Sequence, residues 1–210
     1  MPVSESTIQR YTHADPDVRL MLRVRDDDAA AFEELMLRYQ NRVVSVLAHM
    51  IGGRRDLAED LAQDVFLRVY RARGRYVPGA KFSTWLFTIA GNVASNALRS
   101  QSRRREVNVT AKPGETGANA LELSAEAASA LMPTRQADNA ELRGAVQAAV
   151  ATLGERQRVA VVLAKFEGLS YAEIGEVLGM TPQAVKSLLS RARGKLREAL
   201  APYLEHGQKV

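Results

Sequence analysis

Apolar residues recur every three or four positions through most of the chain, and strand-like alternation of apolar and polar residues is missing. This spacing predicts α-helices, because it places the apolar side chains on one face. One series consists of Phe32, Leu35, Met36, Tyr39, Val43, Val46, Leu47 and Met50. It predicts a helix that starts after Asp26–Asp28 and ends at Gly52-Gly53. A second helix is predicted from about Asp56 to Arg73, with inward residues Leu57, Leu61, Val65, Val69 and Tyr70.

The first 28 residues form an N-terminal extension to this pattern. Residues 1–14 show no sustained periodicity, and we expect them to be irregular. Asp15-Pro16 offers a cap followed by a first-turn proline, so a short helix should run from there to Val24.

Residues 107–139 are predicted to be a flexible, acidic linker. They are rich in Ala, Ser, Gly, Glu and Thr and lack aromatic residues, so they have little apolar surface to bury; residues 120–131 could form a transient helix. Beyond them helical spacing returns in Leu142, Val146, Val150 and Leu153, and then in Val159, Val162, Leu163 and Phe166. The expected fold class is all-α, with two small helical domains at residues 29–106 and 140–204.

The segment from Leu169 to Arg197 has the pattern of a helix-turn-helix. Ser170 and Glu173 have the spacing of a capping box, and Gly179 suits the left-handed end of a helix. Thr181 and Pro182 then start the second helix. Its apolar face consists of Val185, Leu188, Leu189, Ala192 and Leu196, and the opposite face carries Gln183, Lys186, Ser187, Ser190 and Arg191. A recognition helix needs this arrangement in the DNA major groove. An ordinary solvated helix would instead interleave acidic with basic side chains.

A second candidate DNA-binding segment extends from Tyr76 to Arg105. A turn at Val77-Pro78-Gly79 separates Tyr76 from Phe82, and Ser83 or Thr84 is expected to cap the helix that follows. The polar side of that helix carries Trp85, Thr88, Asn92, Asn96 and Arg99, followed by Arg103, Arg104 and Arg105. Rings stack on unpaired bases, amides and hydroxyls bind base edges, and arginines bind phosphates. The mixture suggests a surface for single-stranded nucleic acid.

Charge and composition reduce further the classes of protein to which the chain could belong. The net charge is +5, and basic residues gather in these two segments while the part between them is acidic, which is typical of phosphate binding. The chain has no cysteine and its three histidines are scattered, so we expect no metal site and no cofactor. No apolar run approaches the ~18 residues of a membrane span, and the N-terminus lacks a signal region. We therefore expect a soluble cytoplasmic protein without membrane insertion.

Four short strings, in this order, resemble the extracytoplasmic-function (ECF) sigma factors of bacterial RNA polymerase. They are residues 60–66 (DLAQDVF), 82–86 (FSTWL), 89–92 (IAGN) and 166–171 (FEGLSY). The resemblance covers residues 29–105 and 141–200. It implies sigma-70 region 2 at residues 29–106 and region 4 at residues 140–204. It also implies a factor, not an enzyme, that binds core RNA polymerase, recognises −10 and −35 promoter elements and helps to open DNA.

The resemblance assigns roles to particular residues. The helix 56–73 would dock on the β′ coiled coil of the polymerase through Asp60, Gln63, Asp64 and Arg68, and the β flap is the second expected contact. The loop from Tyr76 to Phe82 would hold a flipped −10 base beside Trp85, Asn92 and Asn96, while Arg99, Arg103 and Arg104 would hold phosphates. The −35 duplex would be read by Gln183, Lys186, Ser187, Ser190 and Arg191, with Thr181 at a phosphate. An anti-sigma factor is the implied regulator.

Simpler interpretations remain open for several residues. Phe82 could be an ordinary core residue, Trp85 a half-buried packing residue, and the polar groups of helix 56–73 ordinary solvated side chains. For the whole protein the alternative is a conventional helix-turn-helix repressor or activator, which leaves residues 60–66 and the amide-bearing helix unexplained. A nucleic-acid enzyme would need clustered carboxylates, and helix capping explains the dense run Asp26–Asp28.

Overall fold

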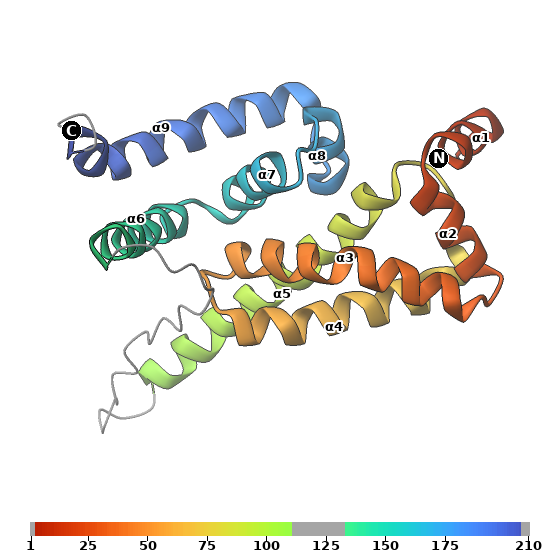
Figure 1. Ribbon diagram of the computed structural model, residues 1–210, viewed down its shortest axis with the longest axis horizontal. Coiled ribbons are helices and arrows are strands. Elements are labelled where there is room, and N and C mark those ends of the chain that lie inside the picture. Colours follow the sequence, from red (N-terminus) through yellow and green to blue (C-terminus); the bar gives the residue numbers. More distant parts are fainter. Residues whose placement is uncertain (1–2, 111–132, 207–210) are drawn as a thin grey trace.

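The computed structural model describes residues 3–110 and 133–206, and within these ranges every regular element is a helix (Figure 1). The N-terminal part contains α1 (Glu5–Ala14), α2 (Pro16–Arg25), α3 (Ala29–Met50), α4 (Arg55–Ala72), the short 3₁₀ helix η1 (Arg73–Arg75) and α5 (Phe82–Thr110). The C-terminal part contains α6 (Pro133–Ala151), α7 (Glu155–Phe166), α8 (Tyr171–Leu178) and α9 (Pro182–His206). The predicted all-α class is confirmed.

The N-terminal domain is built on α3, α4 and α5, which pack side by side with α2 across one end (Figure 1). Val43, Leu47, Val65, Leu86 and Phe87 are fully buried between them. Each such side chain stabilises the fold by roughly 1.5–3 kcal/mol relative to an exposed one. The apolar periodicity of the sequence therefore produces the core that holds α5 in place.

The N-terminal extension is more regular than the sequence predicts. Residues 5–14 form α1, capped by the Ser4 hydroxyl, so the expectation of an irregular segment was wrong. Asp15 caps α2 by accepting from the Asp17 backbone N–H at 2.9 Å. Its other carboxylate oxygen accepts from the Phe82 backbone N–H, also at 2.9 Å. The extension thus holds the loop that leads into α5.

Helix also replaces both ends of the predicted linker. α5 continues to Thr110 and α6 begins at Pro133, so residues 107–110 and 133–139 are helical. The stretch 120–131, considered above as a transient helix, lies outside the described residues. The start of α5 also differs from expectation: the helix begins at Phe82, which places Ser83 and Thr84 inside its first turn instead of at the cap.

The C-terminal domain contains the predicted helix-turn-helix, α8 and α9. Ser170 and Glu173 form the capping box of α8, and Gly179 ends that helix with a φ of 63°. The turn is tight because α8 lies close to the backbone of the residues that follow it. A Cβ built on Gly175 would lie 2.6 Å from the Met180 carbonyl oxygen. Glycine at position 175 is therefore required by the packing of the motif.

The two domains pack against each other, with α7 on α3 and α8 on α5 (Figure 1). The Lys81 Nζ and Glu173 Oε1 atoms are 2.9 Å apart, and Arg42 pairs with Glu167. The Arg158 guanidinium donates to the Met50 carbonyl oxygen at 3.0 Å. Apolar burial accompanies these contacts, since the cluster of buried side chains includes residues of both domains, Ile174 and Leu163 among them.

Four residues of the apolar series that predicted the helices are exposed, and only one of them, Tyr70, was expected to face inward. Phe166 is 51% exposed and its ring lies 4.0 Å from that of His49. Tyr70 is 40% exposed, and its ring lies tilted against that of Phe32 with the centroids 5.1 Å apart. Leu142 and Val146 on α6 are 47% and 40% exposed. Helical spacing identifies a face, but the neighbouring elements decide whether that face is covered.

Candidate nucleic-acid interface

The outward face of α9 carries the polar residues that the sequence predicts for DNA reading. Val185, Leu189 and Ala192 are buried on the opposite face. This packing leaves five side chains exposed on one side of the helix: Gln183, Lys186, Ser187, Ser190 and Arg191. The Ser187 hydroxyl donates to the Gln183 carbonyl and Arg191 Nε to the Ser187 carbonyl, so these contacts stay within the helix. The guanidinium and ammonium ends are available for an external partner.

Thr181 stands at the N-terminus of α9. Its hydroxyl accepts from the Ala184 backbone N–H at 3.3 Å, and the residue is exposed. A helix N-terminus carries unsatisfied N–H groups and a partial positive charge, which favour a phosphate. Further along α9 the side chains of Arg193, Lys195 and Arg197 are exposed, and no ion pair within the described residues involves them.

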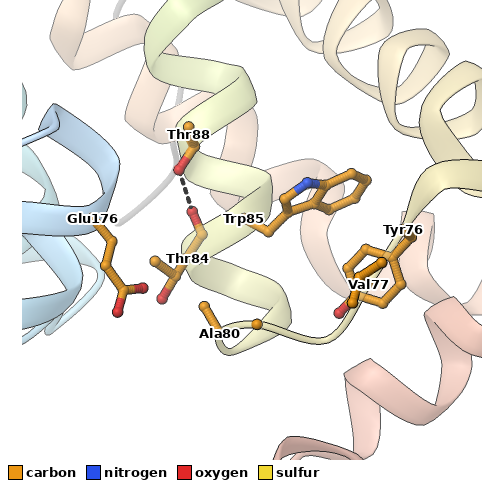
Figure 2. A pocket seen from close by; sticks show the side chains of 8 residues that line it. Tyr76, Val77, Ala80, Thr84, Trp85, Thr88 and Glu176 are labelled. Atoms are coloured by element: carbon orange, nitrogen blue, oxygen red, sulfur yellow. Dashed lines mark hydrogen bonds between the residues drawn. The ribbon is translucent and has the colours of Figure 1, made fainter. Parts of the chain in front are cut away.

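A pocket lies where the loop before α5 meets the first turns of that helix (Figure 2). Its volume is about 190 Å³. The lining consists of Tyr76, Val77, Gly79, Ala80, Thr84, Trp85, Thr88 and Glu176. In the view of Figure 2, Glu176 and Thr84 lie at one end and Tyr76 and Val77 at the other. Loop, helix and the second domain therefore all contribute to one cavity.

Two of the aromatic residues in this region line the pocket, and a third belongs to the core beneath it. Tyr76 and Trp85 line the pocket with ring centroids 4.9 Å apart, and Trp85 is half-buried. Phe82 is 1% exposed and packs edge-on against Tyr39 at 5.2 Å, which matches the core interpretation of this residue. Burial, helped by the charge of Asp15, raises the pKa of Tyr76, so its hydroxyl stays protonated.

Asn92, Asn96, Arg99 and Arg103 lie further along α5, where all four are exposed. They are not part of the pocket lining. Arg99 Nη2 donates to the Asn96 side-chain oxygen at 3.2 Å, which brings two of the predicted residues together. Arg104 is on the same helix, but its side chain lies outside the described residues. The predicted residues of α5 thus form an exposed polar track that leads away from the pocket.

The sequence did not single out Glu176 as a pocket residue. It belongs to α8, almost a hundred positions away in sequence from Trp85, and reaches the pocket only because the domains pack together. Burial raises the pKa of Glu176, and the neighbouring Glu173 carboxylate raises it further. No local sequence pattern could indicate this placement.

A third surface lies on the outer side of α4. Asp60, Gln63 and Arg68 are exposed and Asp64 is partly exposed, and Arg68 Nη2 pairs with Asp64 Oδ2 at 3.0 Å. Leu67, which the sequence analysis did not select, is 53% exposed beside them. Single exposed leucines are common on protein surfaces, but an apolar side chain surrounded by polar groups also suits a protein-binding surface. Leu67 lies four residues after Gln63 and seven after Asp60, so helical spacing places it on the same face of α4. This spacing could have identified Leu67 from the sequence.

Two classes of site are absent from the parts of the chain that the structure describes. No group of three or more His, Asp or Glu side chains there could hold a metal ion. No helix there is long and apolar enough to cross a membrane.

The fold and these surfaces define a two-domain helical DNA-binding protein, and comparison with known proteins supplies its family. Residues 35–104 match Sigma-70 region 2, and residues 143–196 match Sigma-70, region 4. RNA polymerase sigma factor CarQ of Myxococcus xanthus is 42% identical over 86% of this chain and 95% of CarQ. The ECF RNA polymerase sigma-E factor of Escherichia coli K12 is 31% identical over 90% of this chain and 96% of that protein.

Two solved structures have a similar fold. CnrH in complex with the cytosolic domain of CnrY gives a TM-score of 0.64 at 22% identity, covering 90% of this chain and 99% of that chain. The sigma factor RpoE in complex with the anti-sigma factor NepR from Bartonella quintana gives 0.60 at 22% identity, covering 81% and 96%. The chain belongs to the ECF sigma factors and is a promoter-recognising sigma factor of RNA polymerase initiation. The alternative of a conventional helix-turn-helix regulator leaves the region 2 match unexplained.

Proposed function

We propose that this sigma factor binds core RNA polymerase through α4, reads a −35 duplex with α9 and captures the melted −10 strand at the pocket and along α5. The observation that carries the proposal is the division of α9 into a buried apolar face and an exposed face of amide, hydroxyl and cationic groups. Lysine or arginine to guanine and glutamine to adenine are the sterically natural major-groove pairings.

Capture of the melted strand is supported by the two rings and the polar track of α5. Flipping a base costs a few kcal/mol of stacking and pairing, and a pocket that restores stacking offsets that cost. Tyr76 and Trp85 offer ring surfaces. Asn92, Asn96, Arg99 and Arg103 offer amides and cations to the adjoining backbone. A strand that follows this surface would be held without an energy source such as ATP.

The packed arrangement of the domains sets a condition on this step. Glu176 lines the pocket, so an incoming strand with its phosphates would meet a carboxylate there. Lys81 could otherwise bind a phosphate, but it is already paired with Glu173, which lies on α8 together with Glu176. We infer that α8 separates from α5 before the −10 strand is captured.

For core polymerase, the outer face of α4 is the proposed docking surface. Asp60, Gln63, Asp64 and Arg68 supply its polar contacts, and Leu67 supplies an apolar centre. Binding energy in interfaces concentrates in a few buried apolar or aromatic anchors surrounded by polar groups. The β′ coiled coil is the proposed partner of α4, and the β flap that of the C-terminal domain.

An anti-sigma factor is the proposed regulator. It is supported by the sigma factor RpoE of Bartonella quintana, which was solved in complex with the anti-sigma factor NepR. Affinity purification of the tagged chain from its own cells, followed by mass spectrometry, tests this. Recovery of a protein that releases the chain from polymerase supports the proposal, and recovery of polymerase without such a protein contradicts it.

The decisive test of the sigma function is in vitro transcription with bacterial core polymerase on a genomic promoter library. Protein-dependent start sites preceded by two elements at constant spacing are expected. If the chain shifts duplex DNA by itself but starts no transcripts, the proposal fails.

A further inference from the structure

Asp15 caps two helices with one carboxylate. Its Oδ1 atom accepts from the Asp17 backbone N–H at 2.9 Å, which makes Asp15 the N-cap of α2. Its Oδ2 atom accepts from the Phe82 backbone N–H, also at 2.9 Å. Phe82 is the first residue of α5. A single side chain therefore holds the starts of two helices, although Asp15 and Phe82 are 67 positions apart in sequence.

The residue that precedes α5 cannot cap this helix itself. The Lys81 carbonyl oxygen accepts from the Trp85 N–H at 3.2 Å, so the helical hydrogen bonds begin there. A lysine side chain has no hydrogen-bond acceptor, and that of Lys81 pairs with Glu173 of the other domain. The first turn of a helix carries unsatisfied N–H groups and a partial positive charge, and a carboxylate satisfies both. At α5 this carboxylate comes from the N-terminal extension.

Other contacts hold the extension against the loop that leads into α5. Arg19 of α2 donates to the Thr12 and His13 carbonyl oxygens at 3.1 and 2.9 Å, and so fixes the last turn of α1. The side chain of Val3 lies against Gly79, where an added Cβ would be 3.1 Å from Val3 Cγ2. α2 packs against η1 and α5 at this end of the domain (Figure 1). The carboxylate between α1 and α2 is thus held in place by its surroundings.

The helix that receives this cap carries side chains assigned above to the melted strand. Phe82 is 1% exposed, and its ring centroid lies 6.0 Å from that of Trp85 in the same turn. Asn92 and Asn96 follow further along the helix. Helix ends fray, and the loss of a cap weakens the first turn. Loss of the bond at Phe82 would therefore loosen the turn that presents Trp85.

We propose that Asp15 is a positioning residue for capture of the −10 strand, because it fixes the first turn of α5 in the orientation that binds unpaired bases. This inference rests on the proposed function, in which α5 binds the melted strand. Asp15 acts through the Phe82 N–H and contacts no base, since both of its oxygens are occupied by backbone N–H groups. The N-terminal extension thereby takes part in promoter opening.

Substitutions at position 15 separate the two caps. Asparagine is as good an N-cap as aspartate, but it has only one side-chain oxygen. Asp15→Asn should keep the local cap of α2 and lose the hydrogen bond from Phe82, whereas Asp15→Ala should lose both. Asp28→Asn is the matched control. Asp28 caps α3 through the Ala31 N–H, and its second oxygen accepts from Arg23 of α2 instead of from the start of α5.

The test compares three affinities, with holoenzyme reconstituted from bacterial core polymerase and the full chain. They are the affinity of the chain for core polymerase and those of the holoenzyme for the −35 duplex and for the unpaired non-template −10 strand. The strand is a fluorescein-labelled oligonucleotide, and both DNAs come from the promoter most used in library transcription. Asp15→Asn should weaken only strand binding, by about 3- to 10-fold, the usual effect of one hydrogen bond. Asp28→Asn should leave all three affinities unchanged.

Two spectroscopic readouts report on the hydrogen bond itself. In Asp15→Asn the Phe82 amide should exchange faster with solvent, while the Asp17 amide keeps its protection. Trp85 is the single tryptophan of the chain and lies in the first turn of α5. Its emission should move to longer wavelength as that turn loosens.

The contrary outcomes are equally definite. Unchanged strand binding in Asp15→Asn would overturn the inference and leave the sigma function intact, and so would an unchanged rate of exchange at Phe82. An equal loss in all three affinities would show a general folding defect and would also contradict a positioning role. If the wild-type holoenzyme binds the unpaired strand no better than core polymerase does, the proposed function fails and this inference fails with it.

Discussion

Lys81 and Glu173 belong to different domains, and their Nζ and Oε1 atoms are 2.9 Å apart. Lys81 immediately precedes α5, and Glu173 lies in the first turn of α8. The ion pair therefore joins the loop of the proposed base pocket to the helix that supplies Glu176. We expect it to couple the position of the C-terminal domain to access to the pocket.

Charge reversal at this contact should separate the domains. In Lys81→Glu two carboxylates would face each other, and the packed arrangement should become less populated. Förster transfer between dyes on the two domains should fall, and the double variant Lys81→Glu/Glu173→Lys should restore it in part. Arg55→Glu is the matched control, because Arg55 pairs with Glu59 inside α4. Unchanged transfer in Lys81→Glu would show that other contacts hold the domains together.

The same contact should depend on pH. Burial opposes ionisation of Glu173, but hydrogen bonds from Lys81 and the Ser170 backbone prevail and hold the pKa of Glu173 below its ordinary value of 4.5. A carboxyl with a lowered pKa adds stability above its unfolded pKa, and that stability is lost as the pH falls through the folded pKa. The difference in unfolding free energy between wild type and Glu173→Gln should be below about 1 kcal/mol at pH 7 and shrink below about pH 4.5. A difference that grows in acid would contradict this account.

Leu67→Ala should weaken binding to core polymerase about tenfold, because it removes the apolar centre of the α4 surface. The melting temperature should hardly change, since Leu67 is 53% exposed. Titration of labelled core polymerase measures the affinity. Leu37→Ala, at an exposed leucine on α3, is the control. Equal effects of the two substitutions would argue against a specific surface on α4.

Lys186→Ala should relax sequence preference in the −35 element, whereas Lys165→Ala should not. Both lysines are exposed and both substitutions remove one positive charge, but Lys165 lies on α7, outside the helix-turn-helix. A lost base contact is worth about 1–3 kcal/mol at one position, and a lost phosphate contact weakens all sequences alike. Binding to a library of −35 duplexes by the holoenzyme distinguishes the two. A uniform loss for Lys186→Ala would assign that residue to the phosphate backbone.

Two glycine substitutions in the C-terminal domain should act in opposite directions. Gly175→Ala should destabilise the domain by about 1–3 kcal/mol, since its Cβ would lie 2.6 Å from the Met180 carbonyl oxygen. Gly194→Ala should stabilise it by up to about 1 kcal/mol, because this helical position has no atom within 4 Å of the new Cβ. Denaturant unfolding measures both. Similar stabilities for the two variants would show that the helix-turn-helix packs more loosely than described.

The sequence by itself determined the helices, the all-α class and the family. These rest on local rules: apolar spacing gives the buried face of α3, and the Ser170–Glu173 box with Gly179 sets the bounds of α8. The opposite faces of α9 also follow from spacing within one helix. Such features depend on residues close in sequence, so they can be predicted from the sequence directly. Even so, α1 was missed, because few of its residues are apolar and none of them is buried, so it lacks the series of large apolar residues that marks the other helices.

Tertiary structure alone decided which of these faces meet. The exposure of Phe166, the hydrogen bond that the Phe82 N–H donates to Asp15, and the presence of Glu176 in the pocket all depend on residues far apart in sequence. The same holds for Tyr76 and Thr84, whose buried hydroxyls lack a partner within the described part of the chain, since a missing partner is a property of everything that surrounds a group. Local patterns specify what each helix can bury, whereas burial and pairing are set by the packing of all the helices together.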